Sequence, residues 1–230
     1  MDRVRLSFAE ACDFPWPGIN KTKRCEQERL VGEVSHPHTL PALPLEERAP
    51  FYAWLAQFFV CEIDRETWNA LQADGIRETL IRLEPRLKLD FENPLTGEPL
   101  ENLREEFSRL FLLPNGVQLF ASSWASEDDA NHQTADEIAQ LVDQSLLALG
   151  RESIHRAPWG RLQRDHVSVI LDLVSSAAIS HDPRDQALGA HLERELLAPW
   201  FATFGQTLAS RAQNPVYVAL GRLIASFYPA

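Results

Sequence analysis

An adjacent acid and base, Asp165-His166, stand where the sequence predicts a helix over about residues 160 to 180. At 100° per residue, His166 falls within the apolar stripe that Leu162 and Leu173 define, and Asp165 lies along its edge. Desolvating either polar group alone is costly, so each needs a partner. The pair is therefore either a structural contact between neighbouring elements, which the pattern alone favours, or the polar end of a recognition groove.

A second feature is the acidic and aromatic segment from residue 101 to residue 145. It carries nine acidic residues against two basic ones, Arg104 and Arg109. The same segment carries five apolar residues, which the acidic side chains would surround: Phe107, Leu110, Phe111, Phe120 and Trp124. This combination suits a ligand that is basic at one end and apolar further along. The alternative is a solvated acidic face over an ordinary core, which charge runs commonly form.

Metal chemistry has weaker candidates. His181-Asp182 is an HD dipeptide of the kind that all-helical, metal-dependent phosphohydrolases use, with His155 or His166 and Asp185 as further ligands. Because a proline follows directly, a capping pair at a helix end is the favoured interpretation. His191 and Glu195 are spaced i, i+4 and could share a metal, although exposed helix faces often carry such pairs.

Nucleotide and nucleophile motifs are absent from the sequence. There is no phosphate-binding or dinucleotide glycine pattern and no GxSxG elbow. The three cysteines, Cys12, Cys25 and Cys61, include no close pair that could build a disulfide framework or a zinc ribbon. We therefore expect no cofactor, no metal and no enzymatic activity.

Charge and hydropathy exclude two classes of partner. The 230 residues include 22 Lys and Arg against 33 Asp and Glu, a net charge of -11, which argues against nucleic-acid binding. No apolar run is long enough to span a bilayer, and the amino-terminal residues do not have the pattern of a secretory leader. The expectation is a cytoplasmic protein with reduced thiols and no stable membrane insertion.

The pattern of prolines and apolar residues predicts a single all-α domain behind an irregular arm. Six of fifteen prolines fall within the first 50 residues, so residues 1 to 45 are expected to form the arm and residues 46 to 228 the helical domain. About eight helices are predicted, in two halves joined by a hinge loop at about 114 to 132. They cover about residues 46 to 59, 65 to 73, 75 to 87, 100 to 112, 138 to 149, 160 to 180, 183 to 212 (bent at Pro199) and 216 to 227.

Five segments, taken in order, resemble the TorD/DmsD family of redox-enzyme maturation chaperones, which are all-helical cytoplasmic proteins. The resemblance covers about Glu46 to Tyr228. Its segments are Phe51-Tyr52-Ala53-Trp54-Leu55-Ala56-Gln57-Phe58-Phe59, Glu106-Phe107-Ser108-Arg109-Leu110-Phe111, Leu119-Phe120-Ala121-Ser122-Ser123-Trp124, Gln163-Arg164-Asp165-His166 and Leu197-Ala198-Pro199-Trp200.

The resemblance implies a chaperone for Tat export. Such a protein binds the twin-arginine signal peptide of a molybdopterin-containing oxidoreductase, and sometimes its apo form, until cofactor insertion is complete. The binding positions that carry over are Phe107, Leu110, Phe111, Phe120, Trp124, Asp165 and His166. The chain would be a monomer or a dimer that exchanges helices through its hinge. An HD-type phosphohydrolase and an acidic structural adaptor that binds a basic partner are the alternatives.

Overall fold

Ten α-helices and no β-strand make up the part of the chain that this computed structural model describes, residues 44–92, 98–124, 133–150 and 162–228. The helices are α2 (Leu45–Gln57), α3 (Arg65–Leu71), α4 (Asp74–Leu83), α5 (Leu87–Glu92), α6 (Glu98–Phe107), α7 (Ala135–Ala148), α8 (Val167–Ala178), α9 (Pro183–Leu192), α10 (Phe201–Arg211) and α11 (Pro215–Ala225). Two π-helical turns, Ser108–Leu112 and Glu193–Leu197, continue α6 and α9. The all-α prediction is confirmed, whereas nearly all of the predicted arm lies outside the described residues.

Local sequence signals set several of the helix ends. The Asp64 side chain accepts a hydrogen bond from the Thr67 backbone N–H and caps α3, as predicted. Asn214 caps α11 in the same way, and Pro215 occupies its first turn. Behind α7, Gly150 adopts a positive φ of 66°, the left-handed conformation that commonly ends a helix.

Two expected helices are each divided in the structure. The helix predicted over residues 75 to 87 ends at Leu83, and α5 starts separately at Leu87, because Pro85 cannot continue the hydrogen-bonding pattern of α4. The helix predicted over residues 183 to 212 becomes α9, the π-turn and α10. Its predicted bend at Pro199 is a full interruption between Leu197 and Phe201.

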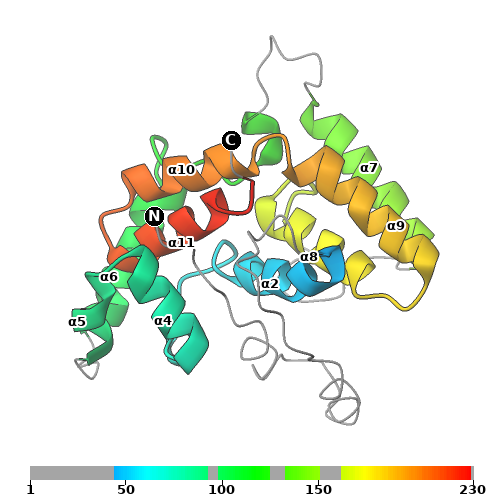
Figure 1. Ribbon diagram of the computed structural model, residues 1–230. Helices are drawn as coiled ribbons and strands as arrows, with labels where there is room; N and C mark the ends of the chain where they lie inside the picture. The colour runs from blue at the N-terminus through cyan, green and yellow to red at the C-terminus, as the bar shows by residue number, and fades with distance from the viewer. Residues whose placement is uncertain (1–43, 93–97, 125–132, 151–161, 229–230) are drawn as a thin grey trace, which may run out of the picture.

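The helices form two groups in space, and neither group follows chain order (Figure 1). In one group α2 packs on α8, and α8 packs in turn on α9 and α7. In the other, α10 and α11 pack together and α11 contacts α4. Each group therefore combines segments from both sides of the predicted hinge, so residues 114 to 132 do not separate the groups in sequence.

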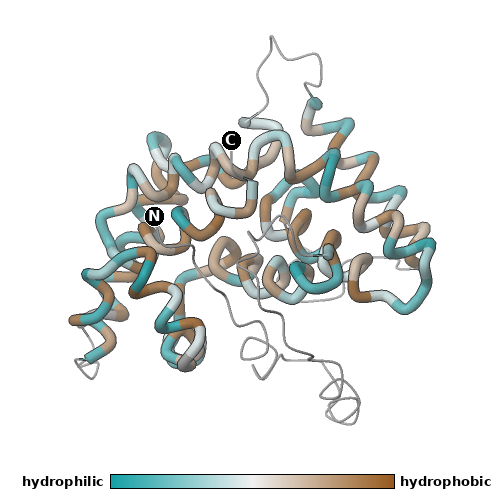
Figure 2. Tube along the Cα trace, in the orientation of Figure 1, coloured by the Kyte–Doolittle hydropathy of each residue, from teal (hydrophilic) through white to brown (hydrophobic). Residues whose placement is uncertain are grey.

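Aromatic rings join the two groups into one core. Tyr52 of α2 contacts Phe227, with ring centroids 5.4 Å apart, and Phe59 contacts Phe204 of α10 at 5.3 Å. All four side chains are buried within one continuous hydrophobic cluster. α7 and α9, which contribute Ile138, Val142, Leu146 and Leu192 to this cluster, alternate between hydrophilic and hydrophobic residues along their length (Figure 2), as expected of helices that bury a single face.

Two glycines let α10 and α11 approach closely. A Cβ atom on Gly205 would lie 2.6 Å from the Ala225 backbone nitrogen and 2.7 Å from the Gly221 carbonyl oxygen. A Cβ atom on Gly221 would lie 2.5 Å from the Ala209 backbone nitrogen. Because these neighbours are backbone atoms, they cannot move aside as a side chain would.

Within the described residues, no helix is both long and apolar enough to cross a bilayer.

Candidate functional site

Asp165 and His166 lie in a turn rather than on a helix face. α8 begins at Val167, and His166 is its N-cap, with the ring nitrogen Nδ1 accepting a hydrogen bond from the Ser168 backbone N–H at 3.2 Å. The predicted helical wheel is therefore wrong at this place, because residues 162 to 166, directly before Val167, are not helical. The predicted burial is confirmed, since Asp165 is 4% exposed and His166 is 5% exposed.

The Asp165-His166 turn is hydrogen-bonded to the loop that carries Phe120. The Ala121 backbone N–H donates to the Asp165 carbonyl oxygen at 2.8 Å, and the Val167 N–H donates to the Leu119 carbonyl oxygen at 2.8 Å. Phe120 and His166 face each other in this isolated antiparallel bridge. The Asp165 carboxylate also accepts a 2.6 Å hydrogen bond from the Ser122 hydroxyl. Asp165 therefore binds the loop through both its backbone carbonyl oxygen and its carboxylate.

His166 is held in an apolar environment. Its ring packs edge-on against Phe120, with centroids 5.7 Å apart. Burial lowers the pKa of His166 from its usual value near 6.5 to about 4. The imidazole is therefore neutral at physiological pH, as its role as a hydrogen-bond acceptor at Nδ1 requires.

We expect His166 to make the protein less stable in acid. A histidine whose folded pKa is depressed contributes no penalty above its unfolded pKa near 6.5, and stability falls as pH drops from there toward 4. From pH 7 to pH 5 this group should lower the free energy of unfolding by about 2 kcal/mol. Denaturant unfolding of the wild type and of His166→Asn, which keeps a good N-cap, measures the difference. Identical pH dependence in both proteins would rule this contribution out.

The π-turn Ser108–Leu112 presents Leu110 and Phe111 at the end of α6. Phe107 and Leu110 are buried, and Phe111 is half-buried. Phe111 packs edge-on against Phe107 at 5.1 Å and against Phe59 at 5.9 Å, so its inner face belongs to the core. Directly after it come two exposed leucines, Leu112 and Leu113, which are 65% and 56% exposed.

Trp124 reaches the same core from the loop. It is half-buried, packs edge-on against Phe204 at 5.6 Å and donates its indole N–H to the Gln118 carbonyl oxygen at 3.1 Å. Phe204 also contacts Phe59, and Phe59 contacts Phe111. A row of rings that passes through the buried Phe204 and Phe59 therefore connects Phe111 with Trp124. Phe120 of the same loop forms a second cluster with Asp165 and His166 of the turn before α8.

Sequence reasoning missed a buried carboxylate on α6, directly before Phe107. Glu106 is 6% exposed and accepts hydrogen bonds from Arg109, at 2.7 and 2.8 Å, and from the backbone N–H groups of Gln213 and Asn214, at 2.5 and 3.0 Å. Burial alone would raise the pKa of Glu106, but these hydrogen bonds lower it below the usual glutamate range. Glu106 thus connects α6 with the α10–α11 turn.

A second buried cluster also escaped the sequence analysis. Glu193 in the second π-turn pairs with Arg48 of α2, with N–O distances of 2.5 and 3.0 Å, and accepts hydrogen bonds from the hydroxyls of Tyr52 and Tyr228. Burial, together with the nearby Glu193 charge, raises the pKa of Tyr52 above the normal tyrosine value. The cluster connects three segments that are far apart in sequence.

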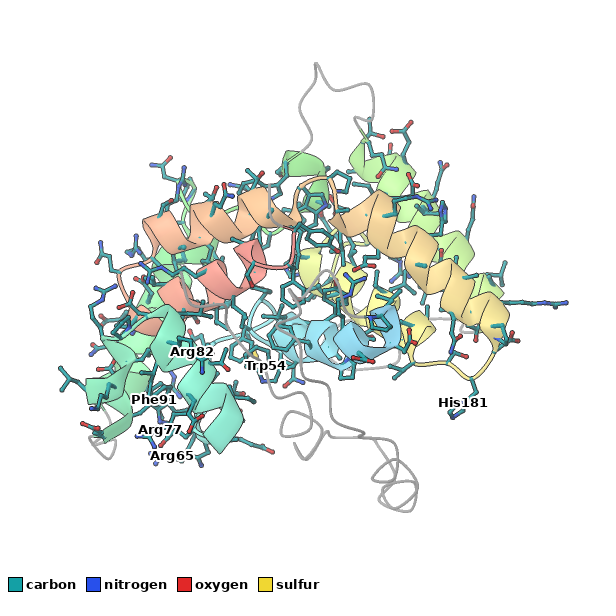
Figure 3. All side chains as sticks on the ribbon, viewed as in Figure 1. Trp54, Arg65, Arg77, Arg82, Phe91 and His181 are labelled. Carbon is teal, nitrogen blue, oxygen red and sulfur yellow. The ribbon has the colours of Figure 1, made fainter. Side chains whose placement is uncertain are left out.

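The candidate metal ligands do not come together. His181 is exposed and projects outward from the turn before α9 (Figure 3), while Asp182 caps α9 by accepting a hydrogen bond from the Arg184 backbone N–H at 2.8 Å. His191 and Glu195 lie 3.8 Å apart on a partly exposed face. Among the described residues no three His, Cys, Asp or Glu side chains form a group that could hold a metal ion, and His155 lies outside them.

The described residues form an all-α protein in which the half-buried Phe111 is followed by two exposed leucines, and two further half-buried rings, Phe120 and Trp124, lie on a loop. The chain is similar to the chaperone protein TorD of Shewanella loihica, with 26% identity over 195 residues that cover 77% of this chain and 88% of that protein. No protein-family model and no solved structure matches the chain.

Proposed function

We propose that this protein belongs to the TorD/DmsD family and acts, without enzymatic activity, as a cytoplasmic chaperone for a molybdopterin-containing oxidoreductase. It would bind the twin-arginine signal peptide and the apo-enzyme, and so delay export until the cofactor is inserted. The similarity to a TorD chaperone over most of the chain supports the class. The order of the five family-like segments supports the same assignment.

The observation that carries the proposal is that half-buried aromatic side chains lie on a loop whose backbone is fixed by the buried Asp165-His166 turn. Phe120 and Trp124 remain half-buried on a loop that is hydrogen-bonded to the Asp165-His166 turn. Trp124 is connected through the row of rings to Phe111, and the exposed Leu112 and Leu113 follow Phe111. Partly covered rings beside exposed leucines suit the apolar stretch of a signal peptide.

The exposure of each residue decides whether it can touch the peptide or only support the surface. Phe107 and Leu110 are almost completely covered, so in this proposal they support the surface instead of touching the peptide. Asp165 is also covered and bonded to Ser122, so it acts by holding the loop in place. Phe111, Phe120 and Trp124 retain the exposed surface that direct contact requires.

Peptide affinity tests these roles. We expect Phe111→Ala and Asp165→Ala each to weaken binding of a synthetic peptide, two consecutive arginines followed by a leucine-rich run, by about 1 to 3 kcal/mol. Ser122→Ala should reproduce much of the Asp165→Ala loss, because it removes the same hydrogen bond. Isothermal titration calorimetry measures the dissociation constants, and circular dichroism verifies that each variant is folded.

Glu66→Ala is the matched control, because Glu66 is an exposed carboxylate on α3, a helix that carries none of the proposed binding positions. Its affinity should equal that of the wild type. If Phe111→Ala and Asp165→Ala are folded and bind as tightly as this control, the proposed surface is wrong. Binding that collapses in moderate salt in every variant would instead favour the acidic adaptor, because exposed charge pairs are screened and apolar contacts are not.

A further inference from the structure

Arg211, at the carboxyl end of α10, contacts the beginning of the loop that carries Phe120 and Trp124. Its guanidinium nitrogen NH1 donates to the carbonyl oxygens of Asn115, at 2.7 Å, and Gly116, at 3.0 Å. These two acceptors lie 96 and 95 positions away in sequence. An arginine that bridges consecutive carbonyls restricts the backbone between them more than a single bond would.

The backbone of Arg211 is held by Arg109, the partner of the buried carboxylate Glu106. Arg109 donates to the Arg211 carbonyl oxygen at 2.8 Å, and Glu106 binds Arg109 together with the backbone N–H groups of Gln213 and Asn214. The α10–α11 turn is thereby fixed on α6 and the π-turn, at the Arg211 carbonyl oxygen and at the two backbone N–H groups that follow it. A guanidinium presented from a fixed backbone gains more from each hydrogen bond, because less freedom is lost on forming it.

The loop is close to the π-turn at the same point. The Val117 backbone N–H donates to the Leu110 carbonyl oxygen at 2.5 Å. A Cβ atom at residue 116 would overlap the Leu110 carbonyl oxygen, so only glycine allows this approach. Residues 115 to 117 are therefore attached on one side to the π-turn that carries Phe111 and on the other side to Arg211.

We propose that Arg211 is a positioning residue for the peptide-binding surface: it fixes residues 115 and 116, and through them the placement of Phe120 and Trp124 relative to Phe111. This inference rests on the proposed function, because it concerns the same surface. Arg211 is exposed and lies outside the five segments that resemble the chaperone family. It acts through the loop backbone and does not contact the peptide.

Hydrogen exchange and peptide affinity, measured on Arg211→Met in the full chain, test the inference. We expect faster amide exchange across residues 116 to 124, a thermal midpoint close to that of the wild type, and about fivefold to tenfold weaker binding of the same synthetic peptide. Arg211→Lys, which keeps the charge and one donor group, should restore part of both effects. Arg194→Met is the matched control, because Arg194 is an exposed arginine that bonds to His191 and Glu195, both within three positions of it.

The outcomes separate this inference from the proposed function. Unchanged exchange in residues 116 to 124 of Arg211→Met would overturn the positioning role. Faster exchange with unchanged peptide affinity would show that the loop contact of Arg211 does not affect peptide binding, and would overturn that part of the inference. If the wild type does not bind the peptide, the proposed function fails, and exchange alone then decides whether Arg211 fixes the loop.

Discussion

Replacing Glu193 by leucine is expected to lower the free energy of unfolding by about 3 to 5 kcal/mol, because it leaves the buried Arg48 guanidinium without its counter-ion. The two tyrosine hydroxyls that donate to Glu193 lose their acceptor in the same step. Urea denaturation followed by circular dichroism measures the change. The size of the loss reflects the cost of an uncompensated buried charge more than the net contribution of the pair.

The double variant Arg48→Met/Glu193→Leu provides the control. Because both charges are removed, it should recover most of the stability lost in Glu193→Leu. Arg104 and Glu62 form an exposed pair at 3.5 Å, and Glu62→Leu should change stability by less than about 1 kcal/mol. A double variant as unstable as Glu193→Leu would show that the loss does not come from the unpaired Arg48.

Substitution of the two contact glycines of α10 and α11 is the second large effect. We expect Gly205→Ala and Gly221→Ala each to destabilise the protein by about 1 to 3 kcal/mol, toward the upper value, because each new methyl group meets backbone of the facing helix. The two losses should not add, since the same widening of the helix pair accommodates both methyl groups. Thermal and urea unfolding of the single and double variants measure these terms.

Gln206→Ala, an exposed position on α10, is the control for helix propensity and should change stability by no more than about 0.5 kcal/mol. Alanine favours helix over glycine by about 1 kcal/mol, so without the close contact Gly205→Ala would stabilise the protein. A stabilised Gly205→Ala or Gly221→Ala variant would show that the helices separate at little cost.

The fold could be predicted where the signals are local. Asp64, Gly150 and the Asn214-Pro215 pair set helix ends through their own backbone and side-chain preferences, and the structure places helix ends at each of them. The start of α8 could not be predicted in this way. Leu162 continues the apolar period of α8, so periodicity alone extends the helix, and histidine is not among the usual N-cap residues that would have marked its beginning.

The site could be predicted only in part, because the partners of its residues are distant in the sequence. Asp165 and His166 stood out because polar residues within an apolar pattern need partners, and both are buried. Their actual partners depend on tertiary structure: Ser122 lies 43 positions from Asp165. Glu106 likewise finds its backbone donors 107 and 108 positions away. No pattern along the chain identifies such pairs, so Arg211 and Glu193 gave no signal in the sequence.

The pairing of α2 with α8 bears on the order in which the chain can fold during synthesis. A buried hydrogen bond from the Ser168 hydroxyl to the Ala56 carbonyl oxygen joins these helices across 112 positions. While a ribosome is still translating the middle of the message, α2 is already made but its partner is not. Its buried face, which includes Phe51, Trp54 and Leu55, must then remain uncovered or be shielded by other factors. The nascent chain should consequently stay sensitive to proteases until α8 has left the exit tunnel.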